Sequence, residues 1–354
     1  MKKVLVGMSG GIDSSVAAAL LKEQGYEVEG VTMLIWKKDS KYPEPVSPNS
    51  CYNPDKTKDL EKIEQVCSAL KIKHRVIDCS DLYEAKVLEN FRAEYISART
   101  PNPCIWCNTL IKFGYLVDKA REETDFDYFA TGHYARIAKR NGRFCLLKAV
   151  DQKKDQSYFL SRLSQDQLSH ILFPLGEYRK DDIRKIDVSY GFHEEGERES
   201  QDFYGGDYSD LIGLENKKGS IVFTDGRVLA EHDGYWHYTI GQRKGLKIAY
   251  SEPLYVVDID SVTNTVVVGT VENTFKSRAE VRNVNYVSSL DFDEDVYSVK
   301  IRSASAGIDA HVEKTDDGFF LTFLSPAKAL TPGQSAVVYS GDAVIASGII
   351  EKAY

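Results

Sequence analysis

Residues 7–16 read GMSGGIDSSV and directly follow the apolar run Val4-Leu5-Val6. The apolar run predicts a short strand and the Ala- and Leu-rich segment 14–24 predicts a helix, so the glycines and serines form the turn between them. Backbone N–H groups at the start of a helix, together with its dipole, attract an anion. The stretch lacks the third glycine of a dinucleotide fingerprint and the lysine of a P-loop. Asp13 instead suits a Mg²⁺ ion that bridges phosphates. We therefore expect the loop to bind pyrophosphate.

The segments after this loop alternate between strand and helix patterns. Strands are predicted at 28–35, 74–78 and 128–130, and amphipathic helices around 60–70 and 113–120. Such alternation predicts a parallel sheet covered on both faces. Ligands of such sheets bind at the carboxyl ends of the strands, which is where the opening loop would lie.

The second half of the chain has a β-rich texture. Runs of Val, Tyr, Thr and Ile are separated by dipeptides typical of hairpin turns, namely Asp225-Gly226, Asp233-Gly234 and Asp317-Gly318. Asn141-Gly142 predicts another hairpin, appended to the first domain. We therefore predict an α/β nucleotide-binding domain followed by two small β-rich domains, with bounds 1–200, 201–275 and 276–354.

Composition narrows the class of protein. The 354 residues are 42% hydrophobic and 28% charged with a net charge of −8, which is ordinary for a globular protein. No export signal and no apolar stretch of about 18 residues is present, so we expect a cytoplasmic protein that does not enter a membrane. The negative charge disfavours non-specific nucleic-acid binding. It leaves room for a local basic surface, such as 139–143 or 243–247.

Residues 99–108, RTPNPCIWCN, form the second informative segment. Cys107 precedes the helical pattern that begins near Phe113, and a cysteine near a helix N-terminus has a lowered pKa. Cys104 and Cys107 form one C-x-x-C pair, whereas a closed zinc site normally needs four ligands. A dithiol or sulfur-carrying role is therefore favoured over a metal site. Among the other cysteines, Cys51 stays open, and core positions are predicted for Cys67, Cys79 and Cys145.

Residues 9–14, SGGIDS, resemble the PP-loop of the N-type ATP pyrophosphatases, which adenylate a carbonyl oxygen. Further segments resemble the tRNA-specific 2-thiouridylases over nearly the whole chain; they are 99–108, 130–134, 154–159, 173–176, 238–245, 255–258 and 331–334. Members of this family use ATP to thiolate the wobble uridine of tRNAs for Lys, Glu and Gln. The resemblance implies a Rossmann-like PP-loop domain, a small central domain and a C-terminal β-barrel. It also implies tRNA and a sulfur-donor protein or sulfide as partners.

The resemblance implies site residues as well. Positions that match ATP contacts are Gly7, Met8, Ser9, Gly10, Gly11, Ile12, Asp13 and Ser14, with Met33 and Gly132 beside the adenosine. Cys107 matches the nucleophile. Positions that match contacts to tRNA or its target base are Asn102, Pro103, Cys104, His133, Lys154, Asp155, Gln156, Arg302 and Gln334. Two plainer alternatives stay open: His133 bonds a sheet carbonyl, and 154–156 is a solvated turn.

The chain departs from the family at two positions. The family usually has Asp where this chain has Cys104. It also has a second catalytic cysteine, in a motif that aligns with residues 200–205, and this chain has Tyr204 there. A phenol neither carries sulfane sulfur nor forms a disulfide. We therefore predict that the resolving role has moved to Cys104. In the competing scheme, Cys104 and Cys107 bind an iron–sulfur cluster with a third ligand such as Cys51.

These observations predict an ATP-dependent tRNA-uridine 2-sulfurtransferase that acts through an adenylated base and a sulfur on Cys107. ATP and Mg²⁺ are the expected cofactors, with the cluster as an addition in the competing scheme. Two alternatives remain. A PP-loop ATP pyrophosphatase acting on a small molecule would not need Cys107 or these β domains. A catalytically impaired tRNA-binding paralogue would account for the lost second cysteine.

Overall fold

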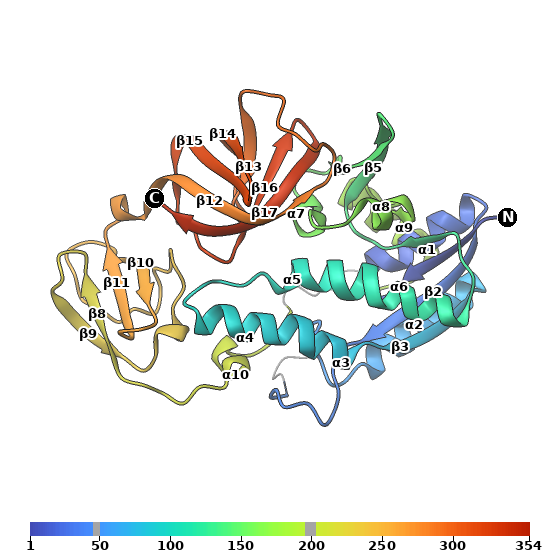
Figure 1. Ribbon diagram of the computed structural model, residues 1–354. Coiled ribbons are helices and arrows are strands. Elements are labelled where there is room, and N and C mark those ends of the chain that lie inside the picture. Colours follow the sequence, from blue (N-terminus) through green and yellow to red (C-terminus); the bar gives the residue numbers. More distant parts are fainter. Residues whose placement is uncertain (45–49, 195–202) are drawn as a thin grey trace. The chain divides into compact units, whose positions relative to one another are not determined.

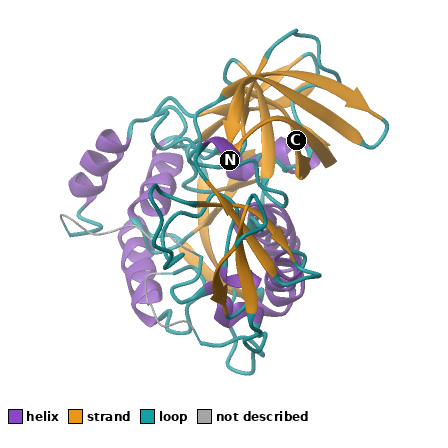
Figure 2. Ribbon diagram, turned by 90° about the vertical axis from the view of Figure 1, so that its left-hand side faces the viewer, coloured by secondary structure: helices purple, strands orange, loops and turns teal. Residues whose placement is uncertain are grey.

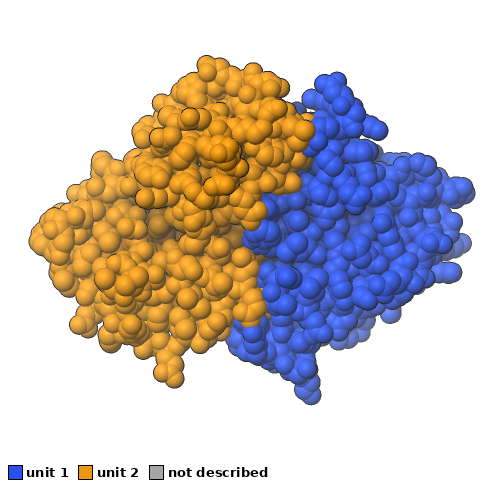
Figure 3. Space-filling model, in the orientation of Figure 1, with its two compact units in different colours: residues 1–87, 104–206, 342–344 blue, residues 88–103, 207–341, 345–354 orange. Residues whose placement is uncertain are grey.

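The computed structural model describes residues 1–44, 50–194 and 203–354, which form two compact units (Figure 3). Unit 1 comprises Met1–Val87, Cys104–Gly206 and Asp342–Val344. Unit 2 comprises Leu88–Pro103, Asp207–Gly341 and Ile345–Tyr354. Within the described ranges, no helix is both long and apolar enough to span a membrane.

Unit 1 is built on a parallel sheet, as the sequence predicts, and its five strands follow the order β3-β2-β1-β4-β7. Its strands are β1 (Lys3–Gly7), β2 (Glu27–Leu34), β3 (Lys73–Asp78), β4 (Tyr128–Ala130) and β7 (Ile171–Leu172). β1 pairs with β2 on one side and β4 on the other. The strand order therefore reverses at β1, and the loop after it lies at the switch point where such sheets bind ligands.

Helices cover both faces of this sheet. They are α1 (Ile12–Glu23), α2 (Thr57–Leu70), α3 (Ser80–Tyr83), η1 (Glu84–Leu88), α5 (Pro103–Trp106), η2 (Cys107–Tyr115), α6 (Leu116–Glu123), α7 (Ser157–Leu160), α8 (Gln165–Ser169) and α9 (Lys180–Tyr190). Ile63 and Val66 of α2 pack with Ala130 in one apolar cluster. On the opposite face, the ring of Phe129 meets that of Phe113 of η2, with centroids 5.6 Å apart. Successive residues of β4 therefore pack into the hydrophobic cores on opposite faces of the sheet.

A hairpin of β5 (Ala135–Arg140) and β6 (Arg143–Lys148) extends unit 1. Asn141 and Gly142 have φ values of 49° and 81°, the left-handed values of a tight hairpin turn. This hairpin is therefore confirmed. Leu147 of β6 pairs with Ala343 at the start of β17.

Unit 2 contains a four-stranded sheet in the order β10-β11-β8-β9. Its strands are β8 (Gly219–Phe223), β9 (Val228–His232), β10 (Tyr255–Asp260) and β11 (Thr265–Gly269). The hairpin at Asp225-Gly226 is confirmed, whereas the one predicted at Asp233-Gly234 is wrong. There β9 ends and a short 3-10 turn, η3 (Tyr235–His237), follows. The ring Nδ1 of His232 accepts the N–H of Gly234 at 3.0 Å, so a side chain ends the strand.

The remaining strands of unit 2 close into a six-stranded barrel in the order β12-β15-β14-β13-β16-β17, with β12 paired to β17 (Figure 2). Their bounds are β12 (Phe275–Tyr286), β13 (Tyr297–Lys300), β14 (Ile308–Thr315), β15 (Gly318–Lys328), β16 (Ser335–Ser340) and β17 (Ala343–Ala353). The β14–β15 connection confirms the hairpin predicted at Asp317-Gly318. Unit 2 also holds α4 (Glu89–Ile96), α10 (Tyr208–Ile212) and η4 (Glu272–Thr274). The predicted fold class, an α/β domain with β-rich domains ending in a barrel, is thus confirmed.

Candidate active site

The loop after β1 is shaped to receive an anion. The backbone N–H of Ser9 donates to Oγ of Ser14 at 3.2 Å, and that hydroxyl donates to the Gly11 carbonyl at 3.0 Å. Gly10 has a φ of 82°, which a side chain would strain. Gly11 is the N-cap of α1, and it provides no side-chain capping bond to the first turn. The N–H groups of that turn therefore remain available to phosphate oxygens.

A lysine does reach this loop, from far along the chain. Nζ of Lys180, the first residue of α9, lies 2.7 Å from Oδ1 of Asp13, across 167 positions of sequence. The hydroxyl of Tyr134 donates to the same oxygen at 2.7 Å. The Lys180 side chain is only 5% exposed, whereas that of Asp13 is 27% exposed. A buried ammonium is thus neutralised by a carboxylate that solutes can still reach.

Sequence analysis missed Lys180. The signal that was available is its place directly after the segment 173–176, which is itself part of the family resemblance. Nothing in local periodicity, however, connects the start of α9 to a loop near the N-terminus.

Gly132 lies directly against the phosphate loop. A Cβ at this position would stand 2.6 Å from the carbonyl carbon of Asp13, so only glycine fits. Gly132 therefore packs against the backbone that carries Asp13. Met33 lies in β2, which pairs with β1 just before the loop.

A buried histidine also holds the loop. Nε2 of His193 lies 3.0 Å from the carbonyl oxygen of Gly10, and its Nδ1 lies 2.7 Å from Oδ1 of Asp187. Both side chains are almost fully buried. Because a carbonyl oxygen only accepts, Nε2 carries the proton in the bond to Gly10. Sequence analysis did not anticipate this contact either.

The cysteine-bearing helix begins earlier than predicted. α5 begins at Pro103 and runs directly into η2, a stretch of π-helix, and then into α6 (Figure 1). Cys107 is therefore inside a helix and not ahead of one. Burial raises the pKa of its thiol to about 12, so the lowered pKa that the sequence predicts is wrong. Within the π-helical stretch, the Gln167 side-chain amide donates to the carbonyls of Thr109 and Phe113, at 2.9 and 3.0 Å.

Three thiols lie within electrostatic range of one buried tyrosine. The Tyr83 hydroxyl has its pKa raised well above the usual value, first by burial and then by its interactions with Cys107, Cys51 and Cys104. The ring of Tyr52, the residue after Cys51, stacks on Tyr83 with centroids 5.9 Å apart. Cys51, left open from the sequence, thus belongs to the same neighbourhood as the C-x-x-C pair.

Tyr204 is the residue at the position where the resemblance implies a second cysteine. Its side chain is buried, and its ring lies 6.4 Å from that of Tyr52. The N–H of Tyr52 donates to the Phe203 carbonyl at 2.9 Å, so the Cys51 loop is hydrogen-bonded beside this position. Residues 200–202 of the motif lie outside the described residues. Cys67, Cys79 and Cys145 are buried, as predicted.

His133 is neutral and enclosed by aromatic rings. Its Nδ1 lies 2.7 Å from Oγ1 of Thr131, and its ring lies 5.7 Å from that of Phe113 and 6.2 Å from that of Phe173. Burial and the charge of Lys112 hold its pKa well below 6.5. A neutral imidazole can recognise a base by hydrogen bonding or stacking and attracts no phosphate by charge.

The residues 154–156 form a bonded turn. Oδ1 of Asp155 accepts the N–H groups of Ala149 and Ser157 at 3.1 and 3.2 Å. Oε1 of Gln156 accepts the N–H of Tyr134 at 2.9 Å. Asp155 and Gln156 thereby hold the segment in shape next to the tyrosine that bonds Asp13. Lys154 is half-buried in this turn.

The remaining predicted contacts lie in unit 2. The Arg302 guanidinium donates to the Ile240 carbonyl at 2.8 Å and also to Oγ1 of Thr331. Nε2 of Gln334 donates to the carbonyls of Thr100 and Pro101, at 3.1 and 2.7 Å. Asn102 and Pro103 are buried. Gln334 thus fixes the backbone just ahead of Asn102.

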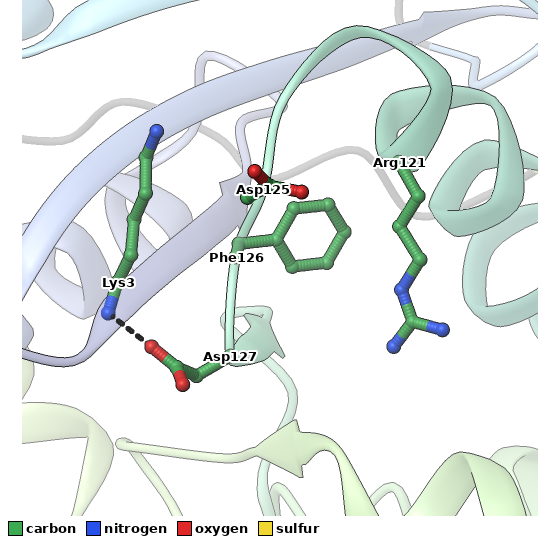
Figure 4. A pocket seen from close by; sticks show the side chains of 5 residues that line it. All are labelled: Lys3, Arg121, Asp125, Phe126 and Asp127. Carbon is green, nitrogen blue, oxygen red and sulfur yellow. Dashed lines mark hydrogen bonds between the residues drawn. The ribbon is translucent and has the colours of Figure 1, made fainter.

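One surface hollow, of about 380 Å³, lies away from the phosphate loop (Figure 4). Its lining residues are Lys3, Arg121, Asp125, Phe126 and Asp127, and the N–H of Lys3 donates to Asp127 at 2.7 Å. Lys3 begins β1 and Asp127 precedes β4. The hollow is therefore at the amino ends of the strands, opposite the edge where ligands bind.

Comparison with known proteins identifies the family. Family profiles described as tRNA methyl transferase HUP domain, tRNA methyl transferase PRC-barrel domain and aminomethyltransferase beta-barrel domain match residues 2–204, 212–270 and 276–350. A protein of Endomicrobium trichonymphae named tRNA-specific 2-thiouridylase MnmA is 42% identical over 98% of this chain and 98% of its own length. The protein of the same name from Clostridium perfringens is 42% identical over 99% of both chains. The one from Clostridioides difficile is 40% identical over 99% of this chain and 98% of its own length. The chain belongs to the tRNA-specific 2-thiouridylase family.

Proposed function

We propose that this protein catalyses the ATP-dependent 2-thiolation of the wobble uridine of tRNA. The observation that carries the proposal is that unit 1 holds both an acidic phosphate loop at the switch point of its sheet and a helix bearing Cys104 and Cys107. Relatives that match over almost the full chain carry the name of this activity. The tRNA set follows the family: the isoacceptors for Lys, Glu and Gln.

The phosphate loop supplies the first half of the reaction. Its N–H groups hold ATP, and Lys180 balances charge on the phosphates while keeping Asp13 in place. The two bonds to Asp13 end on Oδ1, which leaves Oδ2 as a ligand for Mg²⁺. The ion fits this exposed carboxylate and would neutralise the departing pyrophosphate. O2 of the uridine attacks the α-phosphate, which adenylates the base.

Gly132→Ala is expected to weaken ATP binding by about tenfold or more, because its Cβ would displace the backbone of Asp13. Calorimetric titration with ATP measures the effect. Gly142→Asn is the matched control, because a Cβ at that hairpin glycine would meet no atom within 4 Å and asparagine tolerates positive φ. Equal ATP affinity in Gly132→Ala and the control would remove Gly132 from the site.

Cys107 supplies the second half of the reaction. It carries a sulfane sulfur as a persulfide, delivered by a sulfur-donor protein or formed from sulfide and an oxidised thiol. The terminal sulfur attacks C2 of the adenylated uridine, the C2–O bond breaks, and AMP leaves with that oxygen. A second thiol then attacks Sγ of Cys107. The S–S bond breaks, the thione remains on the uridine, and a disulfide is left for a cellular thiol reductant.

Cys104 is our candidate for this second thiol, because C-x-x-C spacing allows exchange within one helical turn. Cys51 is a second candidate, since it interacts electrostatically with Cys107. An iron–sulfur cluster is disfavoured: in the described part of the chain, no three His, Cys, Asp or Glu side chains are arranged to hold a metal ion. Iron analysis of anaerobically purified protein tests this choice.

Mass analysis of tRNA nucleosides from a deletion strain tests the proposed function. We expect 2-thiouridine derivatives to disappear and to return with the wild-type gene. Unchanged 2-thiouridine would favour the impaired paralogue that Tyr204 suggests. A protein that works on tRNA in this way belongs in the cytoplasm, which fractionation of the strain complemented with the wild-type gene can check.

Binding of tRNA should weaken steeply as salt rises, although the net charge of the chain is −8. Each phosphate contact releases counterions and adds close to one unit to the slope of log K against log salt. Lys154→Ala should lower that slope by about one unit. Lys153→Ala, at the exposed neighbouring lysine, is the matched control. An unaltered slope in Lys154→Ala would place the phosphate contacts elsewhere.

A further inference from the structure

Lys112 is a half-buried cation without a counter-ion. It lies on η2, between the buried residues Ile111 and Phe113. It forms no hydrogen bond and no ion pair with any residue that the structure describes, in contrast to Lys180, which is paired with Asp13. Removing an ammonium from water is costly unless an anion compensates. An unpaired lysine in such a position points to an anion that arises during the reaction.

The π-turn brings Lys112 to the face of Cys107. In a regular α-helix, residues five apart are turned by about 140° from each other. In a π-helix the bond runs from residue i to i+5, and the Leu116 N–H indeed donates to the Ile111 carbonyl. Residues five apart then lie on the same side of the helix. Gln167 bonds two carbonyls of this widened turn, so a side chain from α8 holds the stretch that places Lys112 on the side of Cys107.

The charge of Lys112 acts on Cys107 and on His133. Burial raises the pKa of Cys107 and is the larger effect, and the charge of Lys112 lowers that pKa in opposition. It also lowers the pKa of His133. The other titratable groups that interact with Cys107 are the thiols of Cys51 and Cys79 and the hydroxyl of Tyr83. None of these is a cation, so within the described chain Lys112 is the group that favours the sulfur anion.

We propose that Lys112 is the positioning counter-ion of the sulfur anion on Cys107, stabilising first the thiolate that accepts sulfur and then the persulfide anion. The proposal rests on the proposed function for its role in catalysis. The ammonium keeps its protons throughout, and the thiol proton leaves to water. Since His133 stays neutral, the positive charge of the site is concentrated at Lys112.

Alkylation of Cys107 tests the proposal without ATP, tRNA or a sulfur donor. The full-length protein reacts with iodoacetamide between pH 6 and 10, and mass spectrometry follows the peptides of Cys107 and Cys104 separately. In Lys112→Met, the rate at Cys107 near pH 7.5 should fall about tenfold, because raising the thiol pKa by about one unit lowers the thiolate fraction tenfold at any pH well below that pKa. Lys112→Arg, which keeps the charge, should restore most of the rate.

Two controls make the result specific. Lys119→Met removes an exposed lysine of the same helical rod, one that pairs with Glu122, and should leave Cys107 unchanged. The Cys104 peptide in Lys112→Met reports any general loosening of the helix. If Lys112→Met does not fold, as judged by thermal unfolding, Lys112→Gln replaces it.

The outcomes separate this proposal from the proposed function. An unshifted Cys107 profile in the neutral variants, or a shift in Lys112→Arg as large as in Lys112→Met, would overturn the role of Lys112. Loss of thiolation in Lys112→Met with an unshifted profile would assign the lysine to a bound phosphate instead. If the deletion strain keeps its 2-thiouridine while the Cys107 profile shifts as expected, the role of Lys112 as counter-ion is supported and the proposed thiolation activity is refuted.

Discussion

Cys107→Ser is expected to abolish thiolation, and Cys104→Ser is expected to stop it within the first turnover, before the product is released. Cys107 carries the sulfur that bonds to C2, and a serine hydroxyl carries none. Cys104 supplies the thiol that releases the product, so without it the enzyme remains joined to the tRNA through a disulfide. The measurement is the amount of 2-thiouridine formed per enzyme without added thiol reductant, with excess tRNA.

A matched control and an added reductant make this test decisive. Cys145→Ser removes a thiol from β6, where Cys145 is buried and away from the C-x-x-C pair, and should retain multiple turnovers. A small-molecule dithiol should rescue Cys104→Ser but not Cys107→Ser. Full multiple-turnover activity of Cys104→Ser without reductant would contradict the assignment, and Cys51→Ser then becomes the variant to examine.

Asp13→Asn is expected to reduce pyrophosphate release by roughly 10²–10³-fold, the usual loss when a preorganised charge is removed from a transition state. The amide no longer binds Mg²⁺ well and no longer neutralises Lys180. It still offers an oxygen to Lys180 and Tyr134, so the unfolding free energy should fall by only about 1–3 kcal/mol. The assay follows pyrophosphate with ATP and tRNA present, beside a thermal unfolding curve.

Asp181→Asn is the control for this variant. Asp181 lies next to Lys180, but its side chain is 84% exposed and pairs with Arg184. It should show unchanged pyrophosphate release. Near-normal release by a folded Asp13→Asn protein would refute the Mg²⁺ role of the loop.

Local sequence patterns predicted most of the fold. The alternation of strands and helices predicted the parallel sheet, since burial on both faces leaves short apolar runs in the strands. Asn141-Gly142 predicted its hairpin because both residues accept positive φ. At Asp233-Gly234 the same logic failed, since the ring of His232 takes the N–H of Gly234 and ends the strand. A dipeptide specifies a turn only where no side chain competes for its backbone.

The sequence by itself determined the phosphate loop, the C-x-x-C pair and the family, because these depend on residue types at short spacings. The tertiary structure decided which groups complete the site. Lys180 and His193 reach the loop from residues that are distant in sequence, and Gln167 bonds two carbonyls of the helix that carries Cys107 and Lys112. Such contacts leave no periodic trace in the chain, since they depend on which surfaces pack together once the sheet has formed.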